Sequence, residues 1–492
     1  LKLRLKGKEY TESFSALILC GLSSMMRAVQ AARNVRPRFS RSVSQALAEP
    51  TAWNQAPVMV TTLPNGARVA SRETFGDAAT VGVFLEAGIR DETPETAGTT
   101  NILEQLAFMG TAKRPQAKFE QDIESIGGDL SVNMGREQSS FMMTLGKSDA
   151  SKGAEILAEM VTGAPIGIYD KEKASLARKL DGADKPFRAV LDDRLHRCAF
   201  RDSSLGLSSI GPYEEIDKIT SNHLKSYVEK NYTAEKLVFA AAGPMKHDEV
   251  VKMAEGAGIG AIKQGPPPSY HEKPYFCGAE LIYRNDEMGA TAYTSVGWQA
   301  VPWRSPDAVT FMVMAQIIGS YKKDSGLVPG TISGNRVTNA VANKMGVGCA
   351  DEFECFMQFY KDTGIFGFYT VCDEVAVAHC VGELMFGINL LSHAVTDEEV
   401  EKGKRELKVK LFGGNGSSSE ACSEIGQQIL AYGRGIPAAE MILRINAVDA
   451  EEVKRVAWTY CADKDIAVTG VGPLHGMPQY IDLNRMTFMH RY

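Results

Sequence analysis

Residues 97–114 read Ala97-Gly-Thr-Thr-Asn-Ile-Leu-Glu-Gln-Leu-Ala-Phe-Met-Gly-Thr-Ala-Lys-Arg114, and their periodicity predicts a short amphipathic helix that follows a polar loop. On one side of this helix, polar residues stand at offsets of three and four and therefore share a face. Another side is apolar, and we expect it to be buried. The polar residues are Asn101, Glu104 and Gln105, and the apolar ones are Ile102, Leu103, Leu106, Ala107 and Phe108.

The polar face has the spacing of a zinc-peptidase motif without its metal ligands. In the inverted motif H-x-x-E-H, two histidines one helical turn apart hold the metal, and the glutamate activates the bound water. Here Asn101 and Gln105 occupy the histidine positions, and Glu104 occupies the position of the base. Amide oxygens are weak ligands for zinc, so the sequence predicts a degenerate site.

The segments around this helix predict alternating strands and helices. Two β-rich runs within residues 58–71 meet at Pro64-Asn65-Gly66, a strong hairpin signal because Asn-Gly accepts the positive φ angles of a tight turn. A strand at 80–87 precedes the helix. After it we expect a helix at 119–126, strands at 129–134 and 138–145, a helix at 150–161, and a helical segment from about 170 to 200 that Pro186 interrupts.

The chain contains a duplicated unit. Residues 219–244 align without a gap on residues 448–473, and each copy reads as a helix, a short turn and a buried strand ending in Gly-Pro. Residues 81–110 parallel residues 292–319 in the same way. We therefore predict an α+β fold of two homologous lobes, each a mixed, largely antiparallel sheet with helices packed on it. The expected domains are 55–263 and 276–492, joined by a Pro-rich linker at 264–275.

Residues 1–48 are expected to be a leader outside the folded domains. After Met25-Met26 the segment is rich in arginine, alanine and serine, and it holds no acidic residue before Glu49. This composition is typical of a mitochondrial transit peptide, and a disordered basic tail is the alternative. Residues 1–24 begin without Met, so they are either a signal-like segment or an upstream extension.

The composition argues against several classes of protein. A net charge of −6 is not that of a nucleic-acid binder, and no apolar run of 18 or more residues predicts a membrane span. The nine cysteines are scattered and form no C-x-x-C pair, which favours free thiols. Neither H-E-x-x-H nor a phosphate-binding loop nor a nucleophile elbow is present. We interpret His196 as a structural or surface residue, and Tyr360 and Asp362 as fold and interface residues.

Strings in both halves resemble one known family. They are Leu63-Pro-Asn-Gly66, Leu103-Glu-Gln-Leu-Ala-Phe-Met-Gly-Thr111 and Tyr360-Lys-Asp-Thr-Gly-Ile-Phe-Gly367. These residues are similar to the mitochondrial processing peptidase family, whose members include the core proteins of the cytochrome bc1 complex (respiratory complex III). The resemblance covers nearly all of residues 55–492. It favours the β-type branch, core protein 1-like, because the glycine-dense loop of the α-type subunit corresponds here to residues 323–335 with only Gly326, Gly330 and Gly334.

The resemblance also implies a third metal ligand, a distal glutamate in the active members. That position falls on Lys179 within Leu176-Ala-Arg-Lys179, although spacing without a gap points nearer to Asp181. A lysine ammonium would repel the metal. We therefore expect no catalytic residue, no metal and no other cofactor, with Glu104 left as the remnant of the base.

Three functions follow from the resemblance. The first is a non-catalytic structural subunit of complex III, peripheral on the matrix side of the mitochondrial inner membrane. Such a subunit would pair with an α-type, core protein 2-like subunit and pack against cytochrome b, cytochrome c1, the Rieske protein and small subunits. The alternative is a processing peptidase β-like subunit that binds or processes mitochondrial presequences. The third, an active metallopeptidase, is disfavoured by the replaced ligands.

Overall fold

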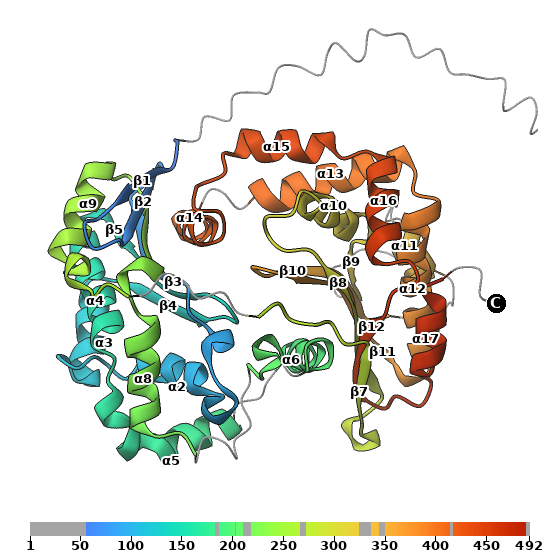
Figure 1. Cartoon of the computed structure of the whole chain (residues 1–492), viewed down its shortest axis with the longest axis horizontal. Coiled ribbons are helices and arrows are strands. Elements are labelled where there is room, and N and C mark those ends of the chain that lie inside the picture. Colours follow the sequence, from blue (N-terminus) through green and yellow to red (C-terminus); the bar gives the residue numbers. More distant parts are fainter. Residues whose placement is uncertain are drawn as a thin grey trace, which may run out of the picture. The chain divides into compact units, whose positions relative to one another are not determined.

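The computed structural model describes residues 56–182, 186–201, 203–209, 218–265, 272–323, 336–343, 350–413 and 417–488, which belong to one compact unit. Two six-stranded sheets form its centre (Figure 1). We call the described residues up to 265 the first half and those from 272 the second half. The predicted leader 1–48 lies outside the described residues, as does most of the predicted linker.

The first sheet has the strand order β1-β2-β6-β3-β5-β4, in which only β2 and β6 are parallel. Its strands are β1 (Met59–Thr62), β2 (Arg68–Glu73), β3 (Ala78–Leu85), β4 (Asp129–Met134), β5 (Ser139–Gly146) and β6 (Leu237–Gly243). The helices of the first half are α2 (Thr99–Ala107), α3 (Gln116–Ser125), α4 (Ala150–Thr162), α5 (Ile166–Gly182), α6 (Phe187–Ala199), α8 (Ser221–Asn231) and α9 (His247–Gly256).

The second sheet has the order β7-β12-β8-β11-β10-β9, in which only β7 and β12 are parallel. Its strands are β7 (Ala279–Arg284), β8 (Thr291–Ala300), β9 (Ser320–Lys322), β10 (Glu352–Phe359), β11 (Gly364–Asp373) and β12 (Ile466–Gly472). The helices of the second half are α10 (Ala308–Ile318), α11 (Arg336–Asn343), α12 (Val377–His393), α13 (Asp397–Phe412), α14 (Ser418–Tyr432), α15 (Ala438–Ala447), α16 (Ala450–Tyr460) and α17 (Tyr480–Met486).

The two sheets share one topology over five strands. The order β2-β6-β3-β5-β4 in the first corresponds to β7-β12-β8-β11-β10 in the second, with the parallel pair at the same place. The repeats found in the sequence are α8–β6 against α16–β12 and β3–α2 against β8–α10. The predicted α+β fold of two homologous, largely antiparallel lobes is therefore confirmed.

Two local predictions are also confirmed, the hairpin turn at Asn65-Gly66 and the interruption of the helical segment at Pro186. The chain turns between β1 and β2 at Asn65-Gly66, where Gly66 has a φ of 91°. The Asn65 side chain donates a hydrogen bond of 2.8 Å to the carbonyl of Ile259 and so fixes the hairpin to the fold. The predicted helical segment around Pro186 is two helices, because proline cannot donate the backbone hydrogen bond that a continuous helix needs.

Each half contributes one helix to the sheet of the other half. Helix α14 packs on β3, β6 and β2 of the first sheet, and α6 packs on β12, β8 and β7 of the second (Figure 1). Phe84 and Ala240 thus share a buried cluster with Ile425, while Leu195 shares another with Ala467. This reciprocal exchange buries one face of each sheet and joins the two halves.

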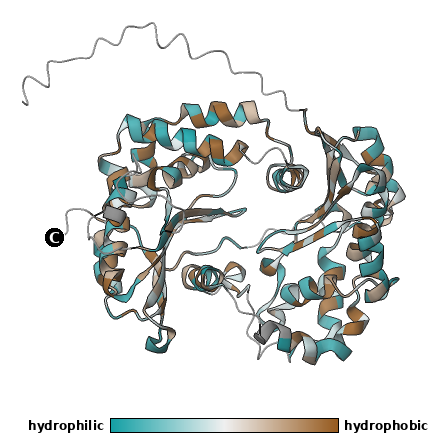
Figure 2. Ribbon diagram, turned by 180° about the vertical axis from the view of Figure 1, so that it is seen from behind, coloured by the Kyte–Doolittle hydropathy of each residue, from teal (hydrophilic) through white to brown (hydrophobic). Residues whose placement is uncertain are grey.

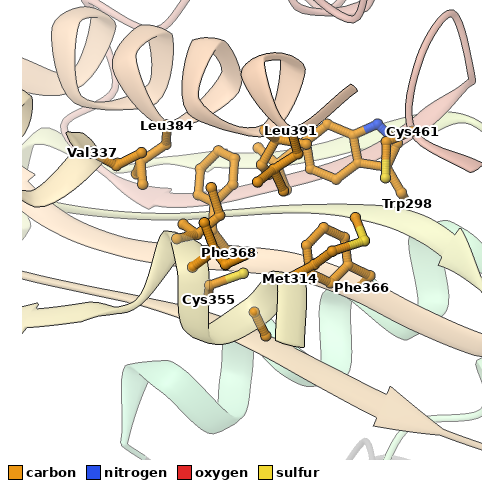
Figure 3. Packing of buried hydrophobic residues seen from close by; sticks show 14 of the residues in the cluster. Trp298, Met314, Val337, Cys355, Phe366, Phe368, Leu384, Leu391 and Cys461 are labelled. Atoms are coloured by element: carbon orange, nitrogen blue, oxygen red, sulfur yellow. The ribbon is translucent and has the colours of Figure 1, made fainter. Parts of the chain in front are cut away.

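The other face of the second sheet forms the largest apolar cluster of the described residues. Trp298, Phe366 and Phe368 project from the sheet and meet Met314 of α10 and Leu384 of α12 (Figure 3). Fully burying a side chain of this size stabilises the fold by about 1.5–3 kcal/mol. The helices that cover the sheets carry hydrophobic and hydrophilic residues along their length (Figure 2), the pattern of helices with one buried side.

One helical stretch of the described residues, Glu374–His393, is long and apolar enough to cross a membrane by length and composition. Polar residues interrupt its apolar run, so the sequence pattern alone predicts no membrane span here. Within the fold, 56% of the apolar window is buried, and the stretch contributes Val377, Leu384 and Ile388 to the core of the second half. We interpret it as a core helix of the second sheet.

The cysteines of the described residues are free, as the scattered spacing predicted. They are Cys198, Cys277, Cys355, Cys372, Cys380, Cys422 and Cys461, and all but Cys277 are buried. Cys20 and Cys349 lie outside the described residues.

Candidate functional site

The helix that carries the degenerate motif, α2, is held at its amino end by a buried carboxylate. Glu92 accepts hydrogen bonds from the backbone N–H groups of Gly98, at 2.8 Å, and Thr100, at 2.6 Å. Burial raises the pKa of Glu92 to about 7, against the opposing effect of these two hydrogen bonds. Gly98 has a φ of 94°, which lets the loop turn sharply into the helix.

The apolar face of α2 packs as predicted, with one correction. Ile102, Leu103, Leu106 and Ala107 are buried, but Phe108 is 42% exposed. Each helical residue turns by about 100°, so Phe108 lies about 240° from Ile102, on the side of the polar residues. The helix also ends there, because Phe108 is its C-cap residue.

The polar face of α2 makes hydrogen bonds to backbone groups. Asn101 donates through Nδ2 to the carbonyl of Ser209 at 3.4 Å, and Glu104 accepts a hydrogen bond from the backbone N–H of Met134 at the end of β4. Burial raises the pKa of Glu104 above its usual value, and the Met134 hydrogen bond opposes that shift. Gln105, the second predicted ligand position, is half-buried beside them. This face therefore contacts edge strand β4 and the loop at 203–209.

The third predicted ligand position is only partly placed. Lys179 and Asp181 both fall in α5, which packs against α2, but their side chains lie outside the described residues. Among the residues that the structure describes, no three His, Cys, Asp or Glu side chains come together in a way that could hold a metal. The residues present at 101 and 105 do not fit a zinc ion either, since neither supplies an imidazole, thiolate or carboxylate.

A buried ion pair next to α2 was not foreseen. Arg136 contacts Asp193 at 3.1 Å and also donates to the carbonyls of Leu205 and Leu207. Asp193 accepts further hydrogen bonds from Ser208 and Ser209. Burial alone would raise the pKa of Asp193, but the charge of Arg136 and the serine hydrogen bonds outweigh it and lower the pKa. The pair fixes the loop that Asn101 contacts, and only tertiary structure brings these distant residues together.

His196 has a structural role, as predicted. It is fully buried, and its Nε2 lies 2.6 Å from the hydroxyl of Tyr360, while its Nδ1 lies 2.7 Å from the carbonyl of Asp192. Burial, together with the charge of Arg136, lowers the pKa of His196 to about 4, so the ring is neutral near pH 7. The His196–Tyr360 contact joins α6 to the β10–β11 turn of the second half.

A second set of ion pairs links the two halves at their hairpin turns. Arg90 is 3% exposed and contacts Glu137 of the β4–β5 turn and Asp362 of the β10–β11 turn, each at 2.5 Å. Lys361 adds a contact of 2.7 Å to Glu86. Asp362 is thus an interface residue, as expected. The chain can hold such buried charges because each carboxylate meets a cation.

A cavity of about 550 Å³ opens beside these ion pairs, lined by residues of both halves. Asn101, Glu104 and Gln105 are not among its lining residues. The remnant of the metal site and this cavity are therefore separate features of the described part of the chain.

Comparison with known proteins agrees with this architecture. Residues 68–213 match the model of the insulinase family (peptidase family M16), and residues 218–407 match that of the peptidase M16 inactive domain. A probable mitochondrial-processing peptidase subunit beta of Arabidopsis thaliana is 35% identical over 88% of this chain and 82% of its own length. The mitochondrial-processing peptidase subunit beta of Blastocladiella emersonii is 33% identical over 96% of this chain and 100% of its own length.

A solved structure gives the same fold. A chain of complex III2 from Candida albicans superimposes with a TM-score of 0.77 at 22% sequence identity, covering 88% of this chain and 100% of its own length. The curated relatives carry the name of the β subunit, which is the branch that the sequence favoured. Two family models and full-length relatives therefore agree with the duplicated fold, and the chain belongs to the M16 (insulinase) peptidase family, in the group of the mitochondrial processing peptidases.

Proposed function

We propose that the chain is a non-catalytic core subunit of mitochondrial respiratory complex III, core protein 1-like, that acts as a structural scaffold. The observation that carries this proposal is the polar face of α2. Asn101 and Gln105 stand at the two ligand positions, and the Asn101 amide holds the backbone of Ser209. Without a metal, nothing lowers the pKa of a water molecule enough for attack on a peptide bond.

In this proposal, Glu104 stabilises the fold. Its carboxylate receives the backbone N–H of Met134 at the end of edge strand β4. A buried backbone N–H without an acceptor costs about 1–3 kcal/mol, so this glutamate has a structural reason to remain after the metal ligands are gone.

The proposed partners follow from the relatives. One structural neighbour is a chain of a complex III assembly, which supports placing this chain beside an α-type, core protein 2-like subunit and near cytochrome b, cytochrome c1, the Rieske protein and small subunits. The relatives named as mitochondrial support a transit peptide within residues 1–48 and a peripheral position on the matrix side of the inner membrane.

A second candidate is a β-like subunit of the processing peptidase that binds or cleaves presequences. The names of the relatives favour it, since they are processing-peptidase β subunits at 33–35% identity. In this case the chain would bind an Arg-rich peptide between its halves. A bound peptide alone is compatible with both candidates, whereas cleavage is compatible only with the second.

The experiment is to isolate complex III from mitochondria that carry either the natural chain or the variant Glu104→Gln. We expect the chain in equimolar amount with cytochrome c1, and we expect the variant to assemble equally well, because a glutamine oxygen still accepts the Met134 N–H. A fluorescent presequence peptide incubated with the purified assembly reports cleavage. Absence of the chain from complex III, or cleavage that Glu104→Gln abolishes, would refute the scaffold proposal.

A further inference from the structure

The second sheet ends in a strand, β7, whose outer edge has no neighbouring strand among the described residues (Figure 1). Its inner edge pairs with β12, and α6 packs against it as well. The equivalent strand of the first sheet, β2, pairs with β6 on one side and with β1 on the other. The second sheet therefore lacks a counterpart of β1, and its β7 edge is left open.

The segment before β7 connects the two halves instead of forming that strand. Residues 272–278 are not in a strand. The carbonyl of Glu272 accepts a hydrogen bond from Arg90 at 3.4 Å, and the N–H of Cys277 donates to the carbonyl of Ala199 at 2.7 Å. Both partners belong to the first half. The segment therefore does not run back along β7 in the way that β1 runs along β2.

The hydrogen bonds to β12 show which backbone groups of β7 face outward. The N–H of Asn285 donates to the carbonyl of Gly472 at 3.1 Å, so residue 285 faces β12. Because backbone groups alternate in direction along a strand, the N–H and C=O groups of Glu280, Ile282 and Arg284 point away from β12. These are the groups that an added strand would bond, as β1 bonds β2.

The side chains of this edge strand are exposed and largely apolar. Leu281 is 38% exposed, Ile282 39% and Tyr283 51%. Open edges of this kind pair readily with another chain, and proteins often prevent such pairing with charged residues. The charges of β7 have opposite signs, with Glu280 near its start and Arg284 at its end. Two like charges would repel a second copy of the strand, whereas one charge of each sign permits pairing.

Two antiparallel copies of β7 are complementary when the pair is centred on Ile282. In this register Ile282 lies opposite Ile282 of the second copy. Glu280 lies opposite Arg284, and the twofold symmetry of the pair repeats this contact. Leu281 lies opposite Tyr283 on the other face. The three outward residues of each copy face one another and exchange roughly six N–H···O bonds.

The neighbouring registers are not complementary. Centring the pair on Leu281 places the charge of Glu280 opposite Ile282. Centring it on Tyr283 places Glu280 opposite Asp286. Like charges directly opposite each other are destabilising, and opposite charges are stabilising. The sequence of β7 therefore selects the register centred on Ile282.

Both charges are accessible to a second copy. Glu280 is exposed, and the side chain of Arg284 is 51% exposed. Arg284 contacts Asp286 at 3.3 Å and lies beside His475. An exposed ion pair of this kind contributes little to stability. A guanidinium has five N–H donors, so Arg284 can also bind the carboxylate of Glu280 from the second copy.

From these observations we infer that β7 pairs with β7 of a second copy of this chain, antiparallel and centred on Ile282, so that the two second sheets become one continuous sheet. Such an interface uses the same surface on both copies, so it closes as a dimer and leaves no β7 edge open. The pairing does not involve the polar face of α2, and the inference therefore does not depend on the proposed function.

The test is sedimentation velocity of the purified full chain, together with hydrogen exchange resolved to peptides. A strand edge buries less area than a standard interface, so we expect a micromolar dissociation constant and a dimer fraction that grows from about 1 to 200 µM chain. Over the same range, amide exchange in residues 279–284 should slow, because the outward N–H groups become bonded. This measurement uses the natural chain and needs no variant.

Charge reversal tests the register. Glu280→Arg places arginine opposite arginine twice and should weaken the dimer about thirtyfold, since each cross-strand pair changes from attraction to repulsion. Arg284→Glu should have a similar effect. The double variant Glu280→Arg, Arg284→Glu should restore the dimer, because the pairs form again with their signs exchanged. The control is Lys322→Glu, on the opposite edge strand β9 of the same sheet, which should leave the dimer unchanged.

A chain that stays monomeric up to about 200 µM would overturn the inference, since it would show that the β7 edges do not associate. A dimer that tolerates both single reversals, or that the double variant does not restore, would also overturn it, because another surface would then form the contact.

Discussion

The exchange of α14 onto the first sheet predicts opposite effects for two similar substitutions. Gly426 lies inside α14, and a Cβ atom added there would meet three ring atoms of Phe84 at 2.4, 2.4 and 2.5 Å. Gly382 lies inside α12, and a Cβ atom there would meet nothing within 4 Å. Both glycines are interior helix residues, so the two substitutions differ only in the space available for the added methyl group.

The magnitudes follow from this geometry. Replacing an interior glycine by alanine stabilises a helix by about 1 kcal/mol, which is the full expected effect of Gly382→Ala. In Gly426→Ala the helix must move outward by about 1 Å to restore normal carbon contacts. Phe84 is 1% exposed on a central strand and cannot turn away, so overpacking costs about 3 kcal/mol. The net effect of Gly426→Ala is a destabilisation of about 2 kcal/mol.

The assay is urea denaturation followed by circular dichroism, together with hydrogen exchange resolved to peptides. Gly382→Ala should raise the urea midpoint, and Gly426→Ala should lower it. Exchange in the Gly426 variant should rise in residues 418–432 and in β3 before the rest of the chain. If Gly426→Ala stabilised the protein as much as Gly382→Ala does, α14 would not pack on Phe84 in solution.

Further predictions concern the buried polar contacts. Replacing Asp193 with Asn leaves Arg136 buried without a charge partner and should lower the free energy of unfolding by about 3 kcal/mol at pH 7. Folding lowers the pKa of Asp193, so its carboxylate stabilises the fold above the unfolded pKa, and this stabilisation is lost as the pH falls through the folded pKa. In urea titrations at acid pH, the free energy of unfolding of the Asn variant should therefore change less with pH than that of the wild type. Folding also lowers the pKa of His196, from an ordinary value of 6.5 to about 4. As the pH falls from 6.5 to about 4, the unfolded chain binds a proton that the folded chain does not, so the free energy of unfolding should decrease, and His196→Gln should reduce that decrease. Tyr360→Phe removes the hydroxyl that contacts His196 and should cost about 1–2 kcal/mol in the same denaturation assay. The double variant Asn101→His, Gln105→His should still hold well under one equivalent of zinc by metal analysis; stoichiometric zinc would show that the remaining surroundings still suit a metal.

Much of the fold was predictable because the signals were local or repeated. The duplication of residues 219–244 at 448–473 predicted the two lobes, and Asn65-Gly66 predicted the first hairpin. The predicted burial of Phe108 was wrong, because Phe108 is next to the apolar residues in the sequence but lies on the opposite side of the helix. The Arg136–Asp193 pair and the cavity beside Arg90 could not be predicted, since their residues come together only through tertiary contacts.

The reciprocal exchange of α6 and α14 has a consequence for how the chain matures. The face of the first sheet that bears Phe84 stays uncovered until synthesis or import has continued to Ser418. During that interval an apolar surface is open to solvent, which makes it a target for chaperones and a starting point for aggregation. A fragment that ends near residue 265 would retain this uncovered surface, so we expect it to aggregate more readily than the full chain, although its sheet has every strand.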